Sequence, residues 1–156
     1  MDILSTRRII PKAIFICLLL LFTNPLSAQK SNLTFHTDGK LATSSHDVYD
    51  NNGILRIRIL YAYDEQGIVE TRTIIGYDKS ERQISTHTYT FDDELIWQES
   101  FKYDRKGNLV KRTQILYEGD LPIKNVYTYK YDYNWDGSWY RCRYFLNKKL
   151  YHTINH

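Results

Sequence analysis

The most regular feature of the sequence is an aromatic residue that recurs every 14 positions, followed by a stretch in which apolar and polar residues alternate. The aromatic positions are Phe35, Tyr49, Tyr63, Tyr77 and Phe91, and after one step of 12 residues Tyr103, Tyr117, Tyr131 and Phe145. Alternation with a period of two is typical of a strand with one covered face. The pattern predicts an all-β fold: a single curled antiparallel meander of about nine strands, shaped as an open half-barrel or spiral.

The turns between the expected strands follow from the residues after each aromatic. In Tyr63-Asp64-Glu65-Gln66-Gly67-Ile68, Asp is favoured at the first position of a type I turn, and Gly67 can adopt the left-handed conformation that follows it. This geometry pairs Asp64 with Ile68 and Tyr63 with Val69. The same register pairs Tyr49 with Leu55, and Tyr103 with Leu109. The repeat length is an even number of residues, and the two residues of each pair are both odd-numbered or both even-numbered. Since side chains alternate between faces along a strand, this register predicts that every repeat aromatic lies on one apolar face, opposite a charged face.

The segment Tyr103-Asp104-Arg105-Lys106-Gly107-Asn108-Leu109 resembles the Tyr-Asp (YD or RHS) repeat, and residues 49–53 and 63–67 match its first five positions. Glu81, Leu95, Leu121 and Trp135 stand where that repeat would have Gly. The resemblance implies a β-repeat fold similar to that of small exported YD-repeat proteins. Large RHS proteins form a shell around a toxin, and this chain is too short for a shell, so the toxin-delivery role does not carry over.

Residues 1–28 are predicted to be a cleaved signal peptide rather than part of the fold. Arg7, Arg8 and Lys12 precede an apolar run at residues 13–22, and Leu26-Ser27-Ala28 supplies a small-residue cleavage site before Gln29. The apolar run is shorter than the roughly 20 residues that span a bilayer, so no membrane span is expected after cleavage. Residues 29–156 therefore form the predicted YD-repeat-like domain, which is secreted, periplasmic or at the cell surface.

Composition narrows the function classes. The net charge of +3 is too small to imply a polyanionic partner, and basic residues on the expected polar face alternate with acids, so we expect no binding of nucleic acid. Catalytic triads, phosphate loops and dinucleotide motifs are absent from the sequence, so an enzyme is not expected. Cys142 is the one cysteine of residues 29–156, and we expect it to be a buried core residue rather than to form an intermolecular disulfide.

One loop fits the beginning of a calcium-binding motif. Asp132, Asn134 and Asp136 supply oxygen atoms at positions 1, 3 and 5, and Gly137 stands at position 6. Position 12, where the EF-hand has a bidentate Glu, is Arg143. The alternative is a long hairpin loop rich in turn-forming residues, and no other cofactor is expected.

Aromatic residues crowd the C-terminal end. Trp135, Trp139, Tyr140 and Tyr144 are candidate binding residues, because exposed rings can stack on sugars; the alternative is that they form the core of the last hairpins. Two hypotheses on function follow. The first is an exported, non-catalytic binding or scaffold module for a protein partner, acting through its aromatic face or a free sheet edge. The second is a module that binds glycans or cell walls through these aromatics.

Overall fold

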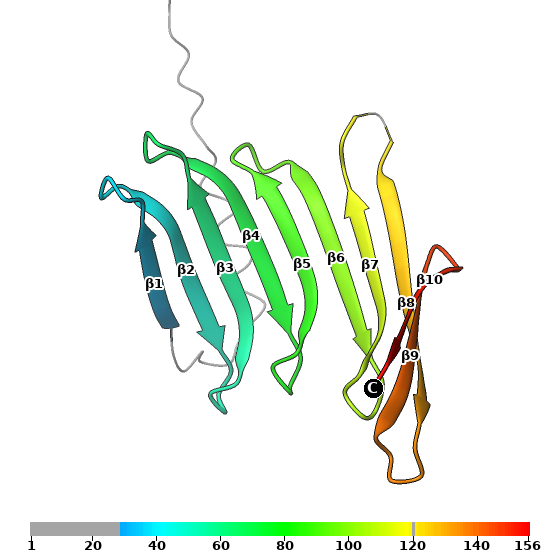
Figure 1. Ribbon diagram of the computed structural model, residues 1–156. Helices are drawn as coiled ribbons and strands as arrows, with labels where there is room; N and C mark the ends of the chain where they lie inside the picture. Colours follow the sequence, from blue (N-terminus) through cyan, green and yellow to red (C-terminus); the bar gives the residue numbers. More distant parts are fainter. Residues whose placement is uncertain (1–28, 120) are drawn as a thin grey trace, which may run out of the picture.

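The computed structural model describes residues 29–119 and 121–156, which form one antiparallel sheet (Figure 1). Each strand pairs with its neighbours in the sequence, so the order in the sheet is β1 to β10. The strands are β1 (Gln29–Phe35), β2 (Leu41–Tyr49), β3 (Leu55–Tyr63), β4 (Val69–Tyr77), β5 (Gln83–Thr90), β6 (Leu95–Tyr103), β7 (Leu109–Leu116), β8 (Ile123–Tyr133), β9 (Trp139–Leu146) and β10 (Lys149–Asn155). The predicted all-β meander is confirmed, with one strand more than expected. The predicted signal peptide, residues 1–28, lies outside the described residues.

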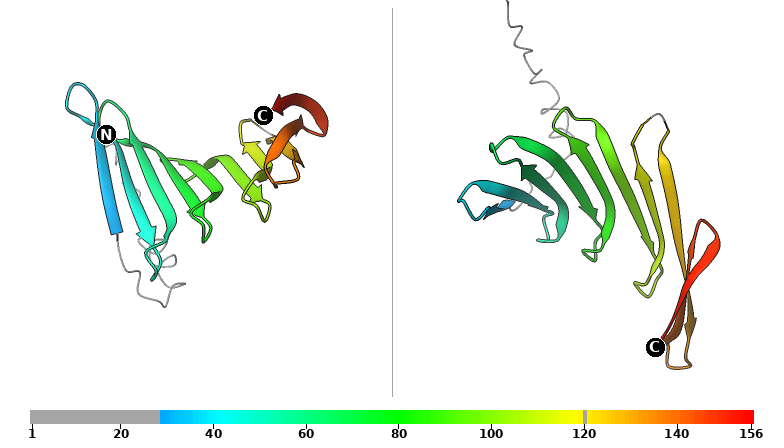
Figure 2. Two further views of the ribbon diagram at one scale, coloured as in Figure 1. Left: turned by 60° about the horizontal axis from the view of Figure 1, so that its bottom comes forward. Right: turned by 45° about the horizontal axis from the view of Figure 1, so that its top comes forward.

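The sheet is open and forms a single layer. β1 and β10 lie at its two ends, and Figure 2 shows that the sheet twists along its width. A twist of this kind is expected for a row of L-amino-acid strands. The buried residues of the described chain are Ser44, Ser45, Asp47, Thr86, Glu99 and Cys142, of which only Cys142 is hydrophobic. The part of the chain that the structure describes includes no helix with the length and apolar character needed to cross a membrane.

The hairpin turns follow the predicted chemistry. In the β3–β4 turn, Gly67 donates its N–H to the carbonyl of Asp64 (3.0 Å), and Asp64 donates to the carbonyl of Ile68 (2.9 Å). The Asp64 carboxylate also accepts hydrogen bonds from the N–H groups of Gln66 and Ile68. Gly67 has φ of 80°, a conformation that L side chains rarely adopt. Where the repeat lacks this Gly, Glu81 and Asp93 adopt the same left-handed region.

We expect Gly67→Ala to lower the free energy of unfolding by about 1 kcal/mol. A Cβ on Gly67 would meet no atom within 4 Å, so the cost arises from the backbone conformation alone. Urea denaturation measures the change. Gln66→Ala, at the neighbouring exposed position, is the control, and an equal loss in both variants would contradict this explanation of the turn.

Some of the repeat aromatics do not have the predicted place beside a turn. In the β5–β6 hairpin the residue that pairs across the turn is Tyr89, opposite Leu95, and Phe91 lies within the turn itself. In the β8–β9 hairpin that residue is Tyr133, opposite Trp139. The turn positions, rather than the aromatic spacing, therefore define the repeat.

The predicted pairs next to the turns are confirmed, but the register changes one residue further on. Tyr63 pairs with Val69, whereas the next pair is Ala62 with Thr71, so Glu70 is an extra residue on β4. Such a β-bulge shifts the alternation of side chains by one position. The same shift occurs next to the turn of the β1–β2, β2–β3, β4–β5, β5–β6, β6–β7 and β8–β9 hairpins.

The prediction that all repeat aromatics share one face is consequently wrong. We define face A as the side of the sheet that carries Ile59 of β3 and its partner Ile74 of β4, and face B as the side that carries Leu60 and its partner Thr73. Consecutive turns lie at opposite ends of the strands, and the aromatics beside them alternate between the faces. Those at one end lie on face A (Phe35, Tyr63, Tyr89), and those at the other lie on face B (Tyr49, Tyr77, Tyr103, Tyr133).

Candidate functional site

An aromatic cluster covers face B at the C-terminal end of the sheet. Its members are Tyr129, Tyr131 and Tyr133 of β8, Trp139 and Tyr144 of β9 and Tyr151 of β10. The β8–β9 register places Tyr129 opposite Tyr144, and their rings stack with centroids 5.8 Å apart. Tyr131 meets Trp139 edge to face at 5.9 Å. Pairs in these geometries stabilise a sheet beyond the area that they bury.

The inner part of the cluster is half-buried. Tyr131 donates its hydroxyl hydrogen to the carbonyl of Leu109 (3.1 Å) and lies next to the buried Cys142. Burial is the main cause that raises the pKa of the Tyr131 phenol, and burial also raises the pKa of Tyr129. The buried position predicted for Cys142 is confirmed, at 5% exposure. These groups link β7, β8 and β9.

The four predicted binding aromatics do not form one surface. Trp139 and Tyr144 are half-buried members of the aromatic cluster. Trp135 is fully exposed in the β8–β9 turn. Tyr140 is 40% exposed, with the guanidinium of Arg141 5.7 Å from its ring centroid. The structure therefore brings Trp139 and Tyr144 into the packed cluster and leaves Trp135 and Tyr140 available to a ligand.

The three predicted calcium ligands have separate partners. The Asp132 carboxylate accepts hydrogen bonds from Arg141 (2.6 Å) and Arg143 (3.1 Å), and the bond from Arg141 is the main cause that lowers its pKa. Asp136 accepts hydrogen bonds from the N–H and the hydroxyl of Ser138, and the Asn134 amide also donates to that hydroxyl. Among the described residues, no group of three or more His, Cys, Asp and Glu side chains is placed to hold a metal ion.

A calcium ion in this loop would have to displace Arg141 and Arg143 from Asp132. We therefore expect that EDTA leaves the melting temperature of the chain unchanged. Differential scanning calorimetry, with and without EDTA and with calcium restored, measures this. A melting temperature that EDTA lowers and calcium restores would support the loop as a calcium site.

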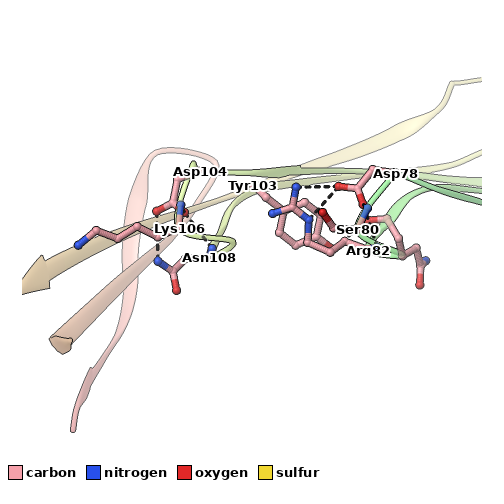
Figure 3. Close-up of polar contacts among 8 residues, drawn as sticks. Asp78, Ser80, Arg82, Tyr103, Asp104, Lys106 and Asn108 are labelled. Atoms are coloured by element: carbon pink, nitrogen blue, oxygen red, sulfur yellow. Dashed lines mark hydrogen bonds and ion pairs between the residues drawn. The ribbon is translucent and has the colours of Figure 1, made fainter. Parts of the chain in front are cut away.

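A second set of contacts joins neighbouring hairpins whose turns lie at the same end of the sheet, and Figure 3 shows two of these turns. In the β4–β5 turn, Arg82 pairs with Asp78 (2.7 Å), and its guanidinium lies 4.7 Å from the ring centroid of Tyr103. Tyr103 belongs to the next hairpin at that end and donates its hydroxyl hydrogen to the carbonyl of Gln83 (2.9 Å). Burial raises the pKa of the Tyr103 phenol. Tyr103 therefore joins the β6–β7 hairpin to the β4–β5 turn.

The following hairpin repeats this arrangement. The Tyr133 hydroxyl accepts a hydrogen bond from Asn108 (2.9 Å) and donates to Asp104 (3.1 Å). The ammonium of Lys106 lies 3.6 Å from the Tyr133 ring centroid and donates to the carbonyl of Gly137. These links were not predicted, although the polar residues four positions after Asp78 and Asp104 were a signal for them. These contacts join neighbouring hairpins within the sheet.

Two ion pairs on face B hold the layer together further from the cluster. Asp47, 2% exposed, accepts hydrogen bonds from the Nε and Nη2 atoms of Arg58 (2.6 and 2.7 Å). Glu99, 8% exposed, accepts from Arg112 and Gln114. Each buried carboxylate thus has charged or polar donors on the next strand, as a buried charge requires.

No model of a protein family matches the chain, and no curated protein matches it. A chain in a crystal structure titled "Crystal Structure of TcdB2-TccC3-Cdc42" is similar, with a TM-score of 0.27 and 16% identity over 80% of this chain. The present chain spans 10% of that one.

Proposed function

We propose that the chain is an exported, non-catalytic binding or scaffold module of the YD-repeat type. The observation that supports this proposal best is the open single layer, in which both faces and both outer strands are left uncovered by other elements of the described chain. The Tyr-Asp turns support the repeat type, since the turns at Asp50, Asp64, Asp78 and Asp104 share the same pair of backbone hydrogen bonds.

The outer strand β1 is the element that we propose to recruit a protein partner. Among the described strands it pairs only with β2, and an unpaired strand edge offers its backbone groups to a strand of another chain. Leu33 and Phe35 on this strand are 58% and 59% exposed, so the edge also presents apolar side chains. A partner strand would gain both hydrogen bonds and apolar contacts there.

Lysines on the edge test this role. The chain is used as bait for proteins of the cell envelope. We expect the native chain to capture a partner and the double variant with Leu33→Lys and Phe35→Lys to lose that partner, since edge lysines oppose strand addition. The control is Ile154→Lys on β10, at the opposite edge, which should keep the partner. Mass spectrometry identifies the captured protein. Equal capture by the edge variant and the native chain would contradict the proposal.

Export is tested separately. When the full sequence is produced in a bacterium, we expect the chain to be recovered from the periplasm or the medium with Gln29 as its first residue. Intact-mass measurement decides this, and a chain found only in the cytoplasm with residues 1–28 attached would contradict export.

Glycan binding is the second candidate function, and the observation that favours it is the full exposure of Trp135. An exposed indole offers a flat surface for stacking on a sugar ring. On a glycan array, this candidate predicts selective binding that Trp135→Ala abolishes and Leu121→Ala preserves. Leu121 is the matched control because it is 79% exposed and lies in another turn. Unchanged binding in Trp135→Ala would exclude the indole as the contact.

A further inference from the structure

Positive charge gathers on face A of the C-terminal half of the sheet. The register of β6 to β9 aligns the cations of alternating positions on this side. We call the set the cationic band: Lys102, Lys111, Lys124, Lys130, Arg141 and Arg143, with Lys148 from the β9–β10 turn. Among the strand residues described on face A from β6 to β9, Asp132 is the one carboxylate. The expectation that basic residues alternate with acids on the polar face is therefore wrong here, because the bulges move Arg112 and Gln114 to face B beside Glu99.

The band includes like charges placed directly opposite one another. Lys102 pairs across the strands with Lys111, and Lys130 pairs with Arg143, whose charge is shared with the Asp132 carboxylate. Like charges at directly opposed positions destabilise a sheet. Departures from such local rules are concentrated at functional sites. A bound anion would remove the repulsion that these pairs create.

A shallow hollow of about 190 Å³ lies within the band and is lined by Thr128, Lys130, Phe145 and Lys148. The ammonium of Lys130 lies 5.3 Å from the ring centroid of Phe145. The lining combines an aromatic ring, a hydroxyl and two ammonium groups. These are the groups that recognise an acidic sugar: the ring contacts its C–H face, the hydroxyl bonds to its oxygens, and the ammonium groups bind its carboxylate.

We propose that face A of β6 to β9 binds an acidic polysaccharide, with one carboxylate-bearing sugar in the hollow and its neighbours along the cationic band. This inference rests on the proposed binding function and names its ligand class. Single-stranded nucleic acid fits less well, because it requires successive aromatic platforms, and the hollow offers the one ring of Phe145. The exposed lysines Lys102 and Lys130 provide the charge complementarity.

Calorimetric titration of the chain of residues 29–156 with oligogalacturonate tests the proposal. We expect saturable binding that weakens as salt is raised and that Lys130→Gln weakens about tenfold, the loss typical of one charged hydrogen bond. Lys102→Gln should also weaken binding while leaving stability equal or higher, because it removes the repulsion with Lys111. Loss of affinity with unchanged or raised stability separates a binding role from a failure to fold.

Lys30→Gln is the control, since Lys30 is an exposed strand lysine on face B of β1. The proposal is overturned if oligogalacturonate does not bind, if Lys30→Gln weakens binding as much as Lys130→Gln, or if oligothymidylate or polyglutamate binds more tightly. Binding to a neutral oligosaccharide of equal length, without oligogalacturonate binding, also overturns it and leaves the proposed binding function in place. Failure of that function would instead leave no glycan and no envelope protein bound.

Discussion

Tyr131→Ala is expected to lower the free energy of unfolding of residues 29–156 by about 3 kcal/mol, the lower end of the range for removing a large packed ring. The ring contacts Trp139 and Tyr133, and the hydroxyl bonds to the Leu109 carbonyl of the neighbouring strand β7. In a sheet of one layer few other contacts replace these, so the loss is large relative to the stability of a small domain.

The conservative variant divides this loss into its parts. Tyr131→Phe keeps the ring and removes the hydroxyl, so we expect it to cost about 1 kcal/mol. Urea denaturation followed by tryptophan fluorescence measures both variants, and Trp139 reports on the cluster directly. Losses below about 0.5 kcal/mol in both, the range of surface substitutions, would contradict the packed aromatic cluster on face B.

The second large effect is expected at the ion pair of β2 and β3. Arg58→Ala removes the two hydrogen bonds that Arg58 donates to the carboxylate of Asp47, which is 2% exposed. We expect a loss of about 2 kcal/mol, less than for a fully buried pair, because the Arg58 side chain is 36% exposed. Arg72→Ala is the control: its partner Asp93 is 65% exposed, so the loss there should stay below about 1 kcal/mol.

The same pair makes stability depend on pH in a defined direction. The hydrogen bond from Arg58 is the main cause that lowers the pKa of Asp47 below its ordinary value of 3.8. The stabilisation is therefore present above pH 3.8 and is lost as the pH falls through the lower pKa of the folded state. Arg58→Ala should reduce the slope of unfolding free energy against pH in this acidic range. An unchanged slope would indicate that Asp47 does not contribute to it.

The fold was predictable to the extent that its determinants are local. The turn at Asp64 and Gly67, and the pairing of Tyr63 with Val69, follow from backbone preferences of a few adjacent residues, and both are confirmed. The number of strands was one too low because the tail after Phe145 forms β10.

The faces were not predictable, because they depend on single inserted residues. Glu70 opposes no residue of its own on β3, and no sequence motif marks it as the bulge. One such residue in a hairpin reverses which side chains share a face. The same cause hid the candidate sites. Trp139 contacts Tyr131, and Tyr144 contacts Tyr129, through the pairing of β8 with β9. The cationic band exists only in the shifted register.

The bulges therefore connect the repeat to the proposed function. They move Arg112 to face B, where it pairs with the buried Glu99, and they leave Lys102 and Lys111 together on face A. Without the bulge of the β6–β7 hairpin, Lys102 and Lys111 would lie on opposite faces, and Lys111 would share a face with Glu99. The separation of a packed aromatic face from a cationic face is a consequence of the register.

Cross-strand backbone NOEs in solution test this register most directly. The structure predicts that Lys102 lies opposite Lys111 and that Lys130 lies opposite Arg143. NOEs that place Lys102 opposite Val110 would continue the turn register without a bulge. That result would move the side chains of β7 to β9 to the opposite faces relative to β6 and would contradict both the two-faced sheet and the cationic band.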